Sequence, residues 1–264
     1  MELERNFKEF DSATIRSVVI SDIGNVRANN EDVGLFSWGD DQSIDRHKGF
    51  LMLVADGLGG HNAGEVASRM AVDIIKHEYF LSKAPVEKSL IKAFELANKK
   101  IFEMSIRDGS MKGMGTTCTA LAVVGNIIYY AHVGDSRAYY LKENEISRIT
   151  IDHTYVGELL YRGAITMEQA LMHPGRNILT NALGSAGSVH IDAGEFAYSF
   201  QEKDHLLVCS DGLYEYLNDQ EIARIMNANS LRQAAHALVE EAKKRGGRDN
   251  ITVVLAEKTL ARNE

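Results

Sequence analysis

Residues 50–58 have the sequence FLMLVADGL, a run of six apolar residues that ends in Asp56-Gly57. A short apolar run bounded by a turn signal is typical of a buried strand. The same pattern returns at residues 206–213, LLVCSDGL, where the run leads into Asp211-Gly212. Both stretches therefore predict a buried strand with an aspartate at its end. The glycine that follows lets the backbone turn tightly or approach a ligand closely.

A third aspartate, Asp249, lies in the glycine-rich turn 246–250, directly before the apolar run 251–255. Taken singly, each of these aspartates is explained by a plain turn, where Asp and Gly are common. Three aspartates at strand ends can also converge at one rim, where ionised carboxylates repel one another unless a cation lies among them. Oxygen ligands select Mg²⁺ or Mn²⁺ over zinc. The spacing leaves plain turns and a divalent-metal site as alternatives.

A polar loop at residues 24–32 places Arg27 five residues before Asp32. One interpretation is a solvated turn in which Arg27 forms an incidental ion pair with the acidic pair Glu31-Asp32. The other is functional: the planar guanidinium of Arg27 binds an oxyanion, and Asp32 orients water on a metal. The loop alone is compatible with both.

The rest of the chain indicates an α+β fold in a single domain of 264 residues, with a core at about residues 14–257 and ragged ends at 1–11 and 261–264. Hairpins outnumber strand–helix alternation, as at the two-residue connection Gly125-Asn126, so we expect mainly antiparallel sheets. Helices come in consecutive pairs, which fits helix layers on sheet faces. The predicted strands are 14–21, 33–38, 50–55, 116–124, 127–131, 137–141, 146–149, 189–200, 206–209 and 251–256. The predicted helices are 64–80, 85–109, 219–227 and 230–245, and residues 152–187 are expected to be helical and loop-rich.

The composition excludes several classes of protein. Apolar residues make up 45% and charged residues 25%, which is typical of a globular chain. A net charge of 29 − 37 = −8 argues against bulk binding to nucleic acid or to anionic membranes. No apolar run approaches the ~18 residues that span a bilayer, and the charged N-terminus does not favour a secretory signal, so we expect a cytoplasmic protein. Cys118 and Cys209 lie in apolar runs and are expected to be buried strand residues.

Six motifs follow one another along the chain. They are Arg27…Asn30-Glu31-Asp32, Asp56-Gly57-Leu58-Gly59-Gly60-His61, Gly115-Thr116-Thr117, Gly134-Asp135-Ser136-Arg137, Ser210-Asp211-Gly212 and Asp249-Asn250. In this order and spacing they resemble the metal-dependent type 2C Ser/Thr protein phosphatase family in its bacterial form. The likeness runs from about residue 14 to 256. Residues 152–154, 162–166 and 173–177 resemble the segment around the mobile flap of that family.

The resemblance implies a four-layer α-β-β-α sandwich, with two central, mainly antiparallel sheets flanked by paired helices. It also implies two core Mn²⁺ or Mg²⁺ ions and a third, weaker ion. Asp56 would bridge the two core ions, and the backbone carbonyl of Gly57 would complete the second site. Asp211 and Asp249 would hold the first ion, Asp32 would act through metal-bound water, and Asp135 would help to hold the third ion.

The implied reaction is hydrolysis of phosphoserine and phosphothreonine by direct attack of a water or hydroxide that bridges the two ions. Arg27 would bind the phosphate oxygens. His61 is a candidate general acid for the leaving alkoxide, although a surface role for His61, or a metal-bound water as the acid, stays open. His132 is expected to be a core histidine, and His153 and His173 to be structural residues of the flap region.

The substrates implied are phosphorylated proteins, the targets of a Ser/Thr kinase, with no nucleic-acid or membrane partner and a monomeric enzyme. Two alternatives are kept: a two-metal phosphatase that acts on a small phosphoester, and a catalytically silent regulatory module of the same fold. The silent module is the weaker alternative, because every metal-type aspartate and Arg27 are present.

Overall fold

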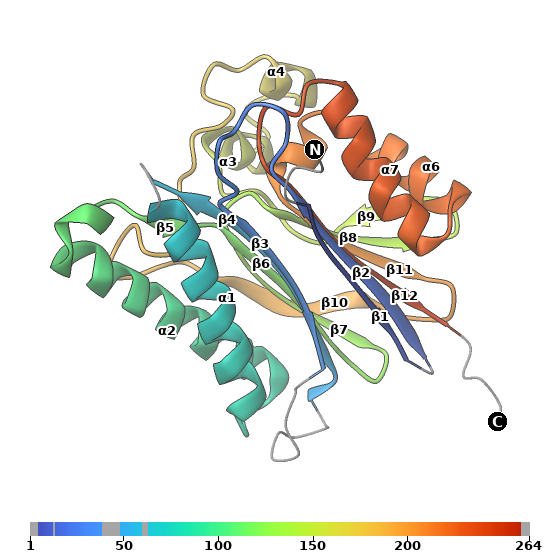
Figure 1. Ribbon diagram of the computed structural model, residues 1–264, viewed down its shortest axis with the longest axis horizontal. Helices are drawn as coiled ribbons and strands as arrows, with labels where there is room; N and C mark the ends of the chain where they lie inside the picture. Colours follow the sequence, from blue (N-terminus) through green and yellow to red (C-terminus); the bar gives the residue numbers. More distant parts are fainter. Residues whose placement is uncertain (1–4, 13, 39–47, 60–62, 260–264) are drawn as a thin grey trace.

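The computed structural model describes residues 5–12, 14–38, 48–59 and 63–259 as two stacked sheets with helices on both outer faces (Figure 1). The first sheet has the strand order β1-β2-β12-β11-β8-β9 and the second has the order β10-β7-β6-β4-β3, with the short β5 paired to β4. Neighbouring strands within each sheet run antiparallel. The predicted antiparallel pairing is confirmed.

Most strands coincide with apolar runs of the sequence, whereas β1, β9 and β10 are rich in polar and charged residues. The first sheet consists of β1 (Arg5–Asp11), β2 (Ile15–Asp22), β8 (Arg137–Lys142), β9 (Glu145–Arg148), β11 (His205–Cys209) and β12 (Ile251–Lys258). The second consists of β3 (Asp32–Ser37), β4 (Phe50–Leu58), β5 (Gly115–Thr116), β6 (Cys118–Val124), β7 (Ile127–Val133) and β10 (Asp192–Ser199).

Paired helices cover the outer face of each sheet. The second sheet is covered by α1 (Ala63–Leu81) and α2 (Val86–Arg107), which is followed by a 3₁₀ turn at Gly109–Met111. The first sheet is covered by α5 (Asp211–Tyr214), α6 (Asp219–Ala228) and α7 (Leu231–Lys244). Two short helices, α3 (Tyr155–Tyr161) and α4 (Met167–Leu171), lie at the upper end of the sandwich in Figure 1.

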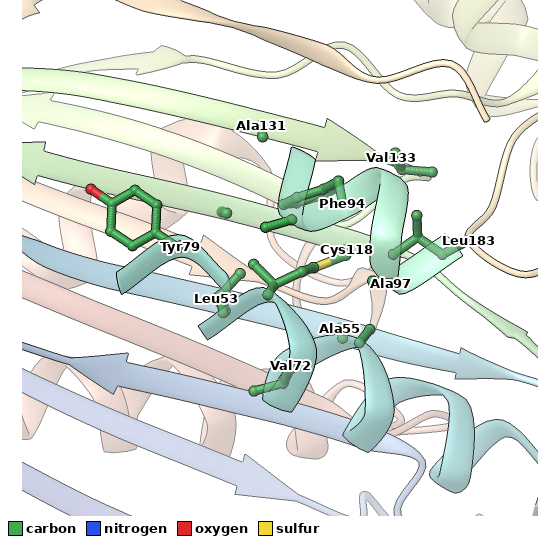
Figure 2. Close-up of a cluster of buried hydrophobic side chains, with 14 of the residues drawn as sticks. Leu53, Ala55, Val72, Tyr79, Phe94, Ala97, Cys118, Ala131, Val133 and Leu183 are labelled. Atoms are coloured by element: carbon green, nitrogen blue, oxygen red, sulfur yellow. The ribbon is translucent and has the colours of Figure 1, made fainter. Parts of the chain in front are cut away.

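The packing explains why the periodicity of the sequence gives this fold. In α2 the residues Leu90, Phe94, Ala97 and Ile101 recur every three or four positions and are fully buried against the second sheet. Figure 2 shows Phe94 and Ala97 in one buried cluster with Leu53 of β4. Each large apolar side chain buried in this way contributes about 1.5–3 kcal/mol. A separate apolar layer lies between the two sheets, so the four-layer α-β-β-α sandwich is confirmed.

The N-terminal prediction is wrong for residues 5–11, which form the edge strand β1 and not a ragged end. β1 pairs with β2 along its whole length, from Arg5 opposite Asp22 to Asp11 opposite Arg16. Phe7 stacks on His236 of α7 at 5.3 Å between ring centroids, and Phe10 lies 5.2 Å from the ring of Phe36. Two aromatic side chains therefore fix a segment that is otherwise rich in charge.

The remaining predictions about organisation have mixed outcomes. Cys118 and Cys209 are buried strand residues with free thiols, as expected. Most of the polar segment at residues 39–48 lies outside the described residues, and so does His61. None of the helices in the described part of the chain is long and apolar enough to cross a bilayer. That the chain is a single domain stays a prediction.

Candidate active site

Four of the predicted aspartates lie at one end of the sandwich, where strands of both sheets terminate. In the second sheet Asp32 of β3 is the direct register partner of Asp56 of β4. In the first sheet β11 ends at Cys209, opposite Val253 near the start of β12. Asp211 therefore follows one strand and Asp249 precedes its neighbour at the same edge.

A hydrogen bond joins the two sheets at this point. Ser210 Oγ, from the first sheet, donates to Asp32 Oδ2 of the second sheet at 2.7 Å. The loop after β2, which carries Arg27, lies beside the turn before β12, because Asn25 Nδ2 donates to the carbonyls of Lys243 and Gly246 (Figure 1). The predicted convergence of these chain segments is thus a property of the fold.

The carboxylates raise one another's pKa. Burial raises the pKa of Asp56 well above its ordinary value, and repulsion from Asp32, Asp211, Asp135 and Asp249 raises it further. The pKa of Asp211 is also raised well above the ordinary value by burial and then by Asp135 and Asp249. Each of these carboxylates lies within electrostatic reach of the others, which costs free energy when all are ionised.

Two further aspartates share this environment. Burial raises the pKa of Asp32 to about 7, although the hydrogen bond from Ser210 acts in the opposite direction. Burial likewise raises the pKa of Asp135 to about 7, with a contribution from Asp152. At neutral pH these groups are poised to lose a proton when a cation approaches.

Two carboxylate oxygens in the site, Asp32 Oδ1 and Asp211 Oδ1, are buried without a hydrogen-bond partner. A buried, unpartnered carboxylate oxygen is costly and is normally satisfied by a donor or by a metal ion. Oxygen donors suit hard divalent cations such as Mg²⁺ and Mn²⁺. The carboxylate oxygens of the site therefore fit the Mn²⁺ or Mg²⁺ ions that the family resemblance implies.

Among the residues that the structure describes, no three or more His, Cys, Asp or Glu side chains are arranged to hold a metal. Asp249 instead accepts a hydrogen bond from Arg27 Nη2 at 2.5 Å. The ion pair of Arg27 is therefore made with Asp249, 222 residues away, and not with the acidic pair of its own loop.

Arg27 lies at the rim of the site, with about half of its side chain exposed (52%). The hydrogen bond that Arg27 donates to Asp249 raises the pKa of Arg27, burial partly opposes the rise, and the charge of Asp56 adds to it. A guanidinium at the rim, near Asp56 and Asp249, is placed to meet an anion that enters from solvent. That Arg27 binds an oxyanion stays a prediction.

Sequence reasoning missed several polar residues that hold the site together. Asn250 Oδ1 accepts from the backbone N–H of Glu31, while Asn250 Nδ2 donates to the carbonyls of Ile23 and Asn29. These bonds fasten the Arg27 loop to the start of β12. Ser210, which reaches Asp32, was likewise given no role. The sequence offered one clue to both residues, because each of them is next to an aspartate of a motif in the chain.

The glycines after the aspartates serve packing and not a tight turn. Asp56 lies inside β4, which continues to Leu58, and Asp211 is the first residue of α5. A Cβ on Gly57 would lie 2.2 Å from the carbonyl oxygen of Gly64, and a Cβ on Gly212 would lie 2.0 Å from that of Asn250. The sequence predicted a turn or an approach to a ligand, whereas the close neighbour is another stretch of backbone.

Asp135 follows Gly134 in the turn between β7 and β8. Gly134 has φ +106°, and a Cβ there would lie 2.6 Å from Cβ of Thr117. Tyr214 Oη donates to the carbonyl of Asp135 at 2.9 Å, and the ring of Tyr214 stacks on Arg137. The turn that presents Asp135 is thus held from both sides.

The histidine predictions can be tested in part. His132 is a fully buried core histidine, bonded to Thr119 Oγ1 at 2.8 Å and to the carbonyl of Ile151 at 3.0 Å, as predicted. Burial lowers its pKa to about 3, so it is neutral. His61 is outside the described residues, and its role as general acid stays a prediction.

Known proteins share both this sequence and this architecture. A family model for protein phosphatase 2C matches residues 34–255. The serine/threonine phosphatase stp of Listeria welshimeri is 39% identical over 247 residues, which cover 91% of this chain and 94% of that protein. The crystal structure of the Mycobacterium tuberculosis serine/threonine phosphatase PstP/Ppp has a TM-score of 0.82 and 34% identity, and the match covers 93% of this chain and 99% of that chain.

A second solved structure, the catalytic domain of PstP in complex with two manganese ions, has a TM-score of 0.77 and 33% identity, again over 93% of this chain and 99% of that chain. Fold, site and matches agree on a class, the metal-dependent phosphoprotein phosphatases. Within that class, the chain belongs to the protein phosphatase 2C family of serine/threonine phosphatases. The resemblance in the sequence is confirmed.

Proposed function

We propose that this chain removes phosphate from phosphoserine and phosphothreonine of proteins modified by a Ser/Thr kinase, and that it uses Mn²⁺ or Mg²⁺. The observation that carries the proposal is the pair of buried, unpartnered oxygens, Asp32 Oδ1 and Asp211 Oδ1, beside the repelling carboxylate of Asp56. Such a site is stabilised by divalent cations. The match to PstP with two manganese ions supports the same choice of ion.

The residues present divide between two core ions and a weaker one. Asp211 and Asp249 would hold the first ion, Asp56 would reach both core ions, and the carbonyl of Gly57 would serve the second. Asp135 would help to hold the third, weaker ion. For Asp249 to take part, its contact with Arg27 has to loosen.

The bound ions would supply an acidified water and neutralise charge on the phosphate. The chain itself would position the reactants. Arg27, released from Asp249, would bind the non-bridging phosphate oxygens in a bidentate manner. Asp32, held by Ser210, would orient water, and His61 would protonate the leaving alkoxide.

The direct test is phosphate release from a phosphothreonine peptide with Mn²⁺, with Mg²⁺ and with EDTA. We expect activity only with the ions, and loss of it in Asp211→Ala and Asp249→Ala. Asp73→Ala, on the exposed side of α1, is the matched control and should keep full activity. Full activity of either site variant, or activity that survives EDTA, contradicts the proposal. Circular dichroism separates loss of function from loss of fold.

The same assay distinguishes the substrate class. We expect phosphopeptides to be turned over far more efficiently than sugar phosphates or nucleotides, and the reverse order indicates a small-molecule phosphatase. The identity of the kinase partner, the monomeric state and the cytoplasmic location stay predictions.

A further inference from the structure

His153 forms hydrogen bonds with both backbone polar groups of Gly134, the residue directly before Asp135. The backbone N–H of His153 donates to the carbonyl of Gly134 at 2.7 Å. The imidazole ring forms a second hydrogen bond with the same residue, in which His153 Nδ1 accepts from the backbone N–H of Gly134 at 3.2 Å. One residue thus satisfies both polar backbone groups of Gly134, and the turn that presents Asp135 is tied to it.

The hydrogen bonds assign a single tautomer to His153. Asn181 Nδ2 also points at His153 Nδ1, at 3.0 Å, and donates to the carbonyl of His190 at 2.7 Å, so this amide nitrogen is a donor on both sides. Nδ1 therefore faces two donors and carries no proton. The other nitrogen, Nε2, lies 3.0 Å from Asp192 Oδ2 and must donate to it.

These bonds connect three parts of the chain. Gly134 lies between β7 and β8, Asp192 begins β10, and Asn181 lies in the segment that returns from α4. The backbone carbonyl of His153 also accepts from Thr180 N–H at 2.9 Å. The side chain of His153 is itself only 11% exposed, and its ring lies 4.7 Å from that of the buried His132 between centroids, with the two ring planes tilted by 48°. Its ring is therefore held rigidly enough to fix its neighbours.

We propose that His153 is a positioning residue: its unprotonated Nδ1 and its backbone N–H fix the Gly134 turn, and thereby hold the Asp135 carboxylate in the orientation needed for the weaker ion. The part that concerns the ion rests on the function proposed above. Groups that orient a ligand in this way change metal affinity or activity about 10–100-fold when they are removed.

Two substitutions separate the two sides of the ring. In His153→Asn the amide oxygen takes the place of Nδ1 and can still accept from Gly134, but the contact with Asp192 is lost. In His153→Gln the amide nitrogen reaches toward Asp192 as Nε2 does, but no acceptor remains opposite Gly134. We expect the asparagine variant to behave like the wild-type protein. The glutamine variant should lose the protection of the Gly134 amide and bind Mn²⁺ more weakly.

The measurements are hydrogen exchange of the Gly134 amide and calorimetric titration with Mn²⁺, with Asp135→Ala as the reference that lacks the weaker ion. His153→Gln should expose the Gly134 amide and weaken the Asp135-dependent binding about 10-fold or more. His190→Asn, which removes the second imidazole contact to Asp192, is the matched control and should leave both readouts unchanged.

Equal losses of Mn²⁺ binding in His153→Asn and His153→Gln would overturn the proposal, because a merely structural role does not distinguish the two nitrogens. The ¹⁵N spectrum of the unchanged protein decides the matter even if neither variant folds: a proton on Nδ1 of His153 contradicts the assignment. Exchange and tautomer are measured without turnover, so a failure of the proposed phosphatase activity would leave these readouts intact.

Discussion

Ser210 Oγ donates a hydrogen bond of 2.7 Å to Asp32 Oδ2, across the interface of the two sheets and across 178 residues of sequence. The same hydroxyl accepts the backbone N–H of Thr252 at 3.0 Å. A hydroxyl has one proton to donate, and Ser210 donates it to Asp32. The oxygen of the same hydroxyl accepts the hydrogen bond from β12. The position of a site carboxylate in one sheet is thus set by a strand of the other.

Ser210→Ala should destabilise the protein by about 1–3 kcal/mol, because it leaves Asp32 Oδ2 buried without this donor. The free energy of unfolding is measured by urea denaturation. Ser188→Ala, at an exposed position, is the control and should remain within about 0.5 kcal/mol of the unchanged protein. Equal effects of the two substitutions would show that the bond between the sheets contributes nothing.

Gly57→Ala and Gly212→Ala should each destabilise the fold by at least about 1–3 kcal/mol, the usual cost of overpacking. The added methyl group would lie 2.2 Å and 2.0 Å, respectively, from a backbone carbonyl that cannot easily move. Gly109→Ala is the matched control, because nothing lies within 4 Å of a Cβ built there. Thermal denaturation of the three variants checks the order, and a Gly57→Ala protein as stable as Gly109→Ala contradicts it.

Most of the fold was predictable because its elements carry local periodicity. The apolar spacing of α2 and the Gly125-Asn126 connection between β6 and β7 give the correct elements without tertiary information. β1 could not be recognised in this way, since Phe7 and Phe10 are separated by two charged residues and make sense only beside their partners. The four-residue α5 is too short for periodicity to reveal.

The candidate site was predictable as a set of residue types but not as a set of contacts. Asp56 and Asp211 stand out because each follows a buried strand and precedes a glycine. The pairing of Arg27 with Asp249 depends on which strands become neighbours 222 residues apart, and local sequence does not contain that information. The anchoring bonds of Asn250 escape sequence reasoning for the same reason.

Arg27→Ala should raise KM for a phosphopeptide about 10-fold or more and change kcat less, since it removes a charge-assisted contact worth about 1.5–3 kcal/mol that is present before the transition state. Arg27→Lys keeps the charge without the planar fork and should recover only part of the loss. Arg69→Ala, on the exposed face of α1, serves as the control. An unchanged KM in Arg27→Ala would show that Arg27 does not bind the phosphate of the substrate.

The metal-free protein should become less stable as pH rises from about 4 to about 7. Asp32 and Asp135 have pKa values of about 7 in the folded chain, against about 3.9 for an unfolded aspartate. Over this range the folded state binds more protons than the unfolded state, so the free energy of unfolding decreases with pH and then levels off above about pH 7.

Thermal denaturation in EDTA across this range measures the effect, and Asp32→Asn should flatten the slope, whereas Asp73→Asn should leave it unchanged. Saturating Mn²⁺ should raise the melting temperature most at the alkaline end, where the carboxylates are ionised and repel one another. The ions would then replace the protons that the site has lost. Two results would contradict this prediction: a metal-free protein whose stability increases with pH, or an Asp32→Asn variant whose stability changes with pH as in the wild-type protein. Either result would show that ionisation of these carboxylates does not destabilise the metal-free site.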